Sequence, residues 1–202
     1  MENFEEIDFL GHKIYKIPLS GIDNSKVEKE LRIDMDLFIP NMRFQDPKFN
    51  KPGIQIDGNA LMGDETRKLF SNAYTKVRDT FTEINQTNFI SGYQRSWFYI
   101  AVPELPNADW HNHLRFHQDY AETFTDWTWV YYVQLPNNCE GDEGKLFFRD
   151  KKKAPTEYYS FFPEEGYVYA FDAQLEHLPA LSPKSTVDRI TAAGNVILNF
   201  ED

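Results

Sequence analysis

The 202-residue sequence has one cysteine, Cys139, so no disulfide can form within the chain. Basic residues are also scarce: 21 Lys and Arg stand against 32 Asp and Glu, which gives a net charge of −11. Such a chain repels phosphate backbones, which argues against nucleic-acid binding. No apolar run approaches the roughly 18 residues of a membrane span, and the acidic N-terminal segment lacks the apolar stretch of a secretory signal. We therefore expect a cytoplasmic protein that binds neither nucleic acid nor membranes.

Aromatic residues, by contrast, are abundant, at 16% of the chain, and they crowd the stretch between Tyr93 and Phe171. Aromatic enrichment with short alternating runs is typical of β-strands. The length of the chain suits one compact domain. Within it, we predict that residues 1–90 form a supporting region of strand and helix and that residues 91–202 form the β-rich core.

The helical signal is clearest over residues 64–84, where Leu69, Ala73, Val77 and Phe81 recur every four positions. A shorter helix is predicted at 24–36, an opening strand at 9–18 and a loop at 40–58. Further strands are predicted at 94–102, 128–135, 145–149, 158–162, 167–172 and 189–200. This order predicts a mainly β fold with supporting helices, arranged as a sandwich or jelly roll.

Histidine and carboxylate are concentrated in one short segment, WHNHLRFHQD, from Trp110 to Asp119. Its residues His117 and Asp119 are two positions apart, so on an extended chain both side chains point to the same side. His177 follows a predicted strand further along and supplies a second imidazole. Two histidines and one carboxylate form a facial triad that holds a divalent metal and leaves positions open.

Arg189 begins the last predicted strand, RITAAGN, and shares one face of it with Thr191 and Asn195. An arginine buried inside a small barrel requires a carboxylate partner, because its planar fork pairs with two oxygens and its charge is costly to bury alone. A ligand with a distal carboxylate would meet this need.

These segments together resemble the 2-oxoglutarate/Fe(II)-dependent oxygenases, particularly their prolyl-hydroxylase-like branch. The resemblance covers about residues 94–200 and rests on the His117–Asp119 motif, TWVYYVQLP, GKLFF, PEEGYVYAF, His177 and RITAAGN, in that order. It implies a double-stranded β-helix core of the jelly-roll, cupin-like kind. It also implies an enzyme that uses Fe(II), 2-oxoglutarate and O2 to hydroxylate its substrate, releasing succinate and CO2.

The resemblance also implies roles for individual residues. His117, Asp119 and His177 would bind iron, and Arg189 would hold the distal carboxylate of 2-oxoglutarate. Tyr132, in the VYY run, corresponds to the tyrosine that bonds the same carboxylate in this family. The residues that share the face of Arg189 are expected beside the cosubstrate; they are Thr191 and Asn195. Tyr132 also lies on a mixed polar and apolar strand face, which suits a wet cavity.

Alternatives remain at this stage. His111 and His113 form a rival ligand pair, H-x-H, and a cupin-like zinc or manganese protein would use them with His117 and His177. Such a protein would be an isomerase, a hydrolase or a binding module. A non-catalytic jelly roll would use its aromatic residues as core and as a binding platform. The sequence predicts a small-molecule or peptide substrate, peptidyl proline among the options, but neither its identity nor the oligomeric state.

Overall fold

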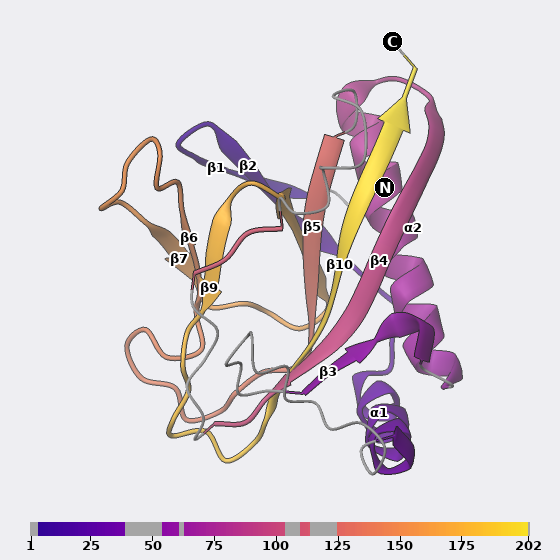
Figure 1. Ribbon diagram of the computed structural model, residues 1–202, viewed down its shortest axis with the longest axis vertical. Helices are drawn as coiled ribbons and strands as arrows, with labels where there is room; N and C mark the ends of the chain where they lie inside the picture. Colours follow the sequence, from indigo (N-terminus) through magenta and orange to yellow (C-terminus); the bar gives the residue numbers. More distant parts are fainter. Residues whose placement is uncertain (1–3, 39–53, 61–62, 104–109, 114–124, 202) are drawn as a thin grey trace.

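The computed structural model describes residues 4–38, 54–60, 63–103, 110–113 and 125–201 (Figure 1). In this part of the chain, the strands form two antiparallel sheets that face each other, and two α-helices cover the outer side of the larger sheet (Figure 1). The large sheet has the order β1-β2-β8-β5-β10-β4-β3, and the small sheet has the order β7-β6-β9. The predicted mainly β architecture with supporting helices is confirmed.

The helices and the strands of each sheet have the following bounds. The helices are α1 (Asn24–Phe38) and α2 (Asp64–Asn85), with a short 3-10 turn, η2 (Gly58–Ala60), between them. The strands of the large sheet are β1 (Glu5–Phe9), β2 (His12–Pro18), β3 (Ile54–Asp57), β4 (Phe89–Ala101), β5 (Thr125–Gln134), β8 (Tyr167–Asp172) and β10 (Arg189–Phe200). The strands of the small sheet are β6 (Leu146–Arg149), β7 (Tyr159–Phe161) and β9 (Glu176–Pro179).

Helix α2 forms where the four-residue period predicts it and packs that apolar stripe on the large sheet. Leu69, Ala73, Val77 and Phe81 are all buried in the core between helices and sheet. The helix begins after Gly63, and the carboxylate of Glu30 on α1 accepts hydrogen bonds from the backbone nitrogens of Glu65 and Thr66. These first backbone N–H groups have no partner within the helix, so α1 supplies the cap.

The two faces of β5 differ, as the sequence pattern predicts. Trp129, Tyr131 and Val133 pack in the core beneath the helices. Val130 instead packs on the second core, between the two sheets, which contains Ile14, Leu146, Phe148, Phe171 and Leu175. Alternate residues of a strand point to opposite faces, so Tyr132 lies on the same inner side as Val130.

Two predictions of local structure need correction, and one strand was missed. The single opening strand at 9–18 is a hairpin, because Leu10 and Gly11 both have positive φ and turn the chain between β1 and β2. Part of the loop predicted at 40–58 is strand β3, which pairs with β4 at the sheet edge; residues 40–53 lie outside the described residues. Strand β9 was not predicted, because EHLP is short and has no alternation.

Candidate metal and carboxylate site

Three histidines converge between the sheets: His111, His113 and His177. One nitrogen of each lies within 4.8 Å of the corresponding nitrogens of the other two, so all three can reach one ion. The His111 and His177 ring centres are 4.2 Å apart, and those of His113 and His177 are 5.1 Å apart. His177 is buried, whereas the other two are partly exposed. We call this group the histidine cluster.

Backbone pairing brings the cluster together. His111 and His177 form an isolated antiparallel bridge, in which His111 N donates to His177 O at 3.2 Å and His177 N donates to His111 O at 2.9 Å. His113 N donates to the carbonyl oxygen of Ala173 at 3.0 Å. Segment 110–113 is therefore held against β9 and the turn that precedes it, although these segments are far apart in the sequence.

The His177 ring is oriented by its own surroundings. Its Nδ1 lies 3.3 Å from the carbonyl oxygen of Leu175. Because a carbonyl oxygen only accepts, Nδ1 carries the proton and Nε2 keeps its lone pair for a metal. The rings of Phe148 and Phe171 pack against His177, and Trp97 packs against His113 with ring centres 5.5 Å apart. These aromatic contacts restrict the rotation of the two imidazole rings.

The donor chemistry fits a divalent first-row metal. Neutral imidazole suits iron, zinc, nickel and copper. His177, which the sequence analysis predicts as a metal ligand, belongs to the cluster. The predicted ligands His117 and Asp119 lie outside the described residues, so their assignment stays a prediction. The rival pair His111 and His113, by contrast, is brought together with His177.

Arg189 is buried, with 2% of its surface exposed, at the start of β10. Its Nη1 donates to the carbonyl oxygen of Ala180 at 2.9 Å. Burial lowers the pKa of Arg189, while the nearby Tyr132, Tyr99 and Cys139 act in the opposite direction. A guanidinium in this position, away from water, favours an anionic ligand.

Two tyrosines converge on the surroundings of Arg189. Thr191, two positions along β10, lies opposite Tyr99 of β4 on one side and Tyr132 of β5 on the other. Burial raises the pKa of Tyr132 to about 12 and also raises the pKa of Tyr99. Both hydroxyls therefore stay protonated at neutral pH and can donate hydrogen bonds.

Tyr99 is a candidate that the sequence analysis missed. Its hydroxyl oxygen is buried and has no hydrogen-bond partner among the described residues. A buried hydroxyl without a partner is costly, so it marks a place where a ligand or water accepts. The signal was present in the sequence, since Tyr99 ends a run of three consecutive aromatic residues, but only the register places it opposite Thr191.

The other two predicted cosubstrate residues occupy different positions along β10. Thr191 donates from Oγ1 to the backbone oxygen of Tyr99 at 3.3 Å. Asn195 lies further from Arg189, where its Oδ1 accepts a hydrogen bond from Thr128 Oγ1 at 3.2 Å. Both are buried on the inner face. Their contact with a cosubstrate stays a prediction.

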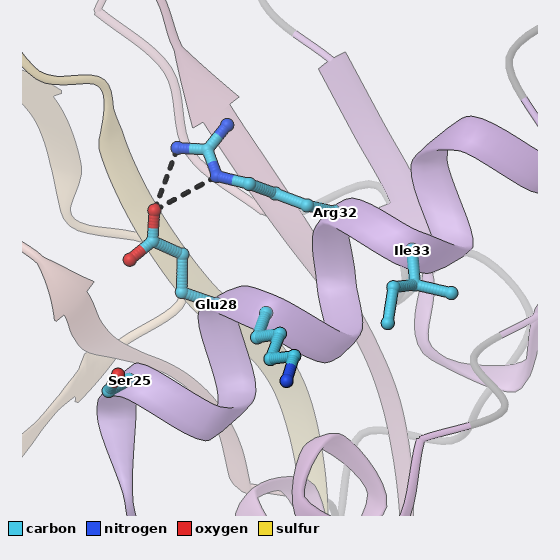
Figure 2. Close-up of a pocket in the computed structure, with 5 residues that line it drawn as sticks. Ser25, Glu28, Arg32 and Ile33 are labelled. Atoms are coloured by element: carbon cyan, nitrogen blue, oxygen red, sulfur yellow. Dashed lines mark hydrogen bonds and ion pairs between the residues drawn. The ribbon is translucent and has the colours of Figure 1, made fainter.

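A separate surface depression lies along α1, lined by Ser25, Glu28, Lys29, Arg32 and Ile33 (Figure 2). Glu28 and Arg32 form an ion pair across one helical turn at 2.8 Å. Helix α1 packs on β5 from the outer side of the large sheet. This depression is therefore separate from the histidine cluster, which lies on the inner side.

Comparison with known proteins places the fold. No protein-family model matches the sequence, and no curated protein matches it either. Among solved structures, the chain is similar to the non-haem alpha-ketoglutarate-dependent carbocyclase SnoK from nogalamycin biosynthesis, with TM-score 0.63 and 11% identity over 92% of this chain and 79% of SnoK. It is also similar to a Pseudomonas putida prolyl-4-hydroxylase, with TM-score 0.57 and 13% identity over 95% and 94% of the two chains.

A third similar structure is the viral collagen prolyl hydroxylase vCPH from Paramecium Bursaria Chlorella virus-1 in its 2OG complex. Its TM-score is 0.51 and its identity 13%, over 96% of this chain and 95% of that one. At such low identities the likeness concerns the fold, which is the double-stranded β-helix that the sequence analysis expected. That fold prediction is confirmed. None of the described helices is long and apolar enough to cross a membrane.

Proposed function

We propose that this protein is a 2-oxoglutarate- and Fe(II)-dependent oxygenase that hydroxylates a small-molecule or peptide substrate. The main observation in favour of this proposal is that a histidine cluster and a buried arginine lie on the inner side of one double-stranded β-helix. The solved structures with this fold support the proposal, since two of them are named as prolyl hydroxylases and a third as an alpha-ketoglutarate-dependent enzyme.

The spacing between the histidine cluster and Arg189 suits a five-carbon dicarboxylic acid. Arg189 is bonded to the carbonyl oxygen of Ala180, which lies three residues after His177. Three residues of extended chain span about 10 Å. A dicarboxylate with its oxo-acid end on a metal at His177 can then place its distal carboxylate near the guanidinium. Tyr132 and Tyr99, which flank Thr191 on the neighbouring strands, would donate to the same carboxylate.

For the metal we propose His111, His113 and His177 as ligands, on the strength of their convergence. The set predicted from sequence, His117, Asp119 and His177, is the alternative, and both sets share His177. When bound, Fe(II) with 2-oxoglutarate and O2 supplies the oxidation of a substrate C–H bond, coupled to release of succinate and CO2.

The chain's own residues prepare this chemistry. His177 keeps its proton on Nδ1 by donating to Leu175 O, which leaves Nε2 for the metal. Arg189 binds and orients the cosubstrate through its distal carboxylate, and the tyrosine hydroxyls add directional donors. Phe148, Phe171 and Trp97 pack apolar rings against the imidazoles of the cluster and hold them in place.

The direct test is equilibrium binding of 2-oxoglutarate to the protein loaded with Fe(II) under anaerobic conditions, followed by measurement of succinate after O2 is admitted. We expect a metal-dependent complex with a charge-transfer absorption band and slow succinate release even without the true substrate. A protein that binds Fe(II) but not 2-oxoglutarate would contradict the proposal.

A second candidate function is a cupin-like zinc or manganese protein. The observation that favours it is that all three clustered donors are imidazoles, a set that also suits zinc. Such a protein has no use for a buried Arg189 beside two tyrosine hydroxyls. Tight zinc binding together with absence of 2-oxoglutarate binding would favour this alternative.

A further inference from the structure

Arg149 on β6 connects two segments of the chain that carry clustered histidines. Its Nε donates to Glu176 Oε2 at 2.8 Å, and its guanidinium carbon lies 4.3 Å from the centre of the Trp110 ring. The Arg149 and Glu176 side chains are only 23% and 22% exposed. Partial burial strengthens both contacts relative to a fully solvated pair. We call Trp110, Arg149 and Glu176 the arginine clasp.

Each member of the clasp is the chain neighbour of a residue in or against the histidine cluster. Trp110 precedes His111, and Glu176 precedes His177. Arg149 follows Phe148, which pairs with His177 in the β6–β9 ladder, while Arg149 itself pairs with Glu176. Successive residues of an extended chain point to opposite sides. The clasp therefore lies behind the cluster, on the side away from the metal-binding nitrogens.

The segment that carries His111 and His113 needs such support. Among the described residues, its backbone is held by one isolated bridge to β9 and by the hydrogen bond from His113 N to Ala173 O in the turn before β9. A single bridge does not fix the rotation of a segment in the way that a continuous ladder does. The contact between the Trp110 ring and Arg149 adds a further attachment point, immediately before His111.

We propose that Arg149 is a positioning residue for the metal site: it fastens segment 110–113 to β9, so that the imidazoles are held in a ligating arrangement before the metal binds. The inference rests on the proposed metal site. It extends that site to residues that do not touch the metal. Residues that orient ligands contribute to metal affinity because they reduce the ordering required on binding.

The chemistry of arginine suits this position better than that of lysine. A guanidinium is planar, so it can stack on the Trp110 ring with its face while its edge donates to the Glu176 carboxylate. The ammonium group of lysine is a compact point charge, so it cannot stack on the Trp110 ring and at the same time donate along the edge of a planar group to Glu176. The Arg149→Lys variant should therefore recover only part of what Arg149→Met loses.

The experiment titrates metal-free protein with Co(II), and separately with Zn(II), without 2-oxoglutarate. We expect Arg149→Met to bind either ion about 10-fold more weakly than the wild type, the lower end of what loss of a ligand-orienting partner costs. The matched control is Arg67→Met, which breaks the Asp64 pair on α2, on the other side of the large sheet. The control should bind metal as the wild type does.

A second measurement uses hydrogen exchange of the metal-free protein. The backbone N–H groups of His111 and His113 donate to His177 O and Ala173 O. We expect both to exchange faster in Arg149→Met, with no change at the amides of α2. A purely global loss of stability would instead accelerate exchange in all elements. If Arg149→Met does not fold, Trp110→Leu removes the ring from a segment outside the regular strands and carries the same test.

The outcomes separate the two proposals. A wild-type protein that binds neither ion overturns the metal site and the clasp with it. A wild type that binds metal, with Arg149→Met unchanged in affinity and in exchange at His111 and His113, overturns the clasp alone. Weaker metal binding, together with faster exchange confined to segment 110–113, supports the clasp.

Discussion

Arg189 Nη1 donates to the carbonyl oxygen of Ala180 at 2.9 Å, and Ala180 lies three residues beyond His177. This bond ties the start of β10 to the end of β9, which carries the buried histidine of the cluster. The side-chain hydrogen bond therefore fixes the guanidinium against the backbone of the segment that follows His177. It supports the assignment of one ligand to both groups.

The first prediction concerns Arg189. Arg189→Met should weaken 2-oxoglutarate binding by at least about 10-fold, because a charge-assisted hydrogen bond contributes about 1.5–3 kcal/mol. Metal affinity measured without 2-oxoglutarate should be retained. Isothermal titration under anaerobic conditions checks both quantities. If Arg189→Met bound 2-oxoglutarate as tightly as the wild type, Arg189 would not bind the carboxylate.

The second prediction separates the two ligand sets. If His111, His113 and His177 bind the metal, His113→Ala should lower metal affinity by more than the roughly 10- to 100-fold that outer contacts cost. Asp119→Ala should then have a small effect. A large loss of metal affinity in Asp119→Ala, with a small loss in His113→Ala, would favour His117 and Asp119 as ligands. The matched control is His12→Ala, since His12 pairs with Asp150 and Asp172 rather than with the cluster.

The third prediction concerns the hydroxyl of Tyr99, which has no hydrogen-bond partner among the described residues. Tyr99→Phe removes one donor and keeps the ring, so 2-oxoglutarate affinity should fall by about 5- to 10-fold, equivalent to about 1 kcal/mol. The free energy of unfolding of the ligand-free protein should not fall. Tyr74→Phe, on α2, is the control. An unchanged 2-oxoglutarate affinity in Tyr99→Phe would place its hydroxyl outside the cosubstrate site.

The fourth prediction concerns acid stability. The hydrogen bond from His12 lowers the pKa of Asp150 below its usual 3.8 in the folded protein. A carboxyl with a depressed pKa contributes stability above its unfolded pKa and loses it as the pH falls through the folded value. Urea unfolding between neutral pH and pH values below 3.8 should show this loss. Asp150→Asn should flatten that part of the profile, whereas Asp142→Asn, on an exposed turn, should leave it unchanged.

The fifth prediction concerns the packing that supports the large sheet. Phe81 on α2 is 1% exposed, and its ring centre lies 4.0 Å from that of Trp127. Phe81→Ala should lower the free energy of unfolding by about 3–5 kcal/mol, because it removes buried area and leaves a cavity. Chemical denaturation followed by tryptophan fluorescence measures this. Ile33→Ala, at an exposed position of α1, should change stability little.

Local pattern accounts for most of the fold that could be predicted. The four-residue period of Leu69, Ala73, Val77 and Phe81 is a property of the helix itself, and α2 forms over almost the predicted residues. The two faces of β5 follow from alternation along one strand. The hairpin at Leu10 and strand β9 were missed, because a left-handed non-glycine residue and a four-residue strand leave little trace in the sequence.

The candidate site also combines features that the local sequence specifies with features that depend on tertiary contacts. The sequence by itself singled out His177 and Arg189 as candidate site residues, and it determined that Thr191 and Asn195 share the face of Arg189, because alternation on one strand is local. Only the tertiary structure decided that His111 and His113 meet His177 and that Tyr99 meets Thr191. Those contacts depend on which strands pair and in which register. Pairing and register follow from closure of the whole sandwich around its core, which no local pattern specifies.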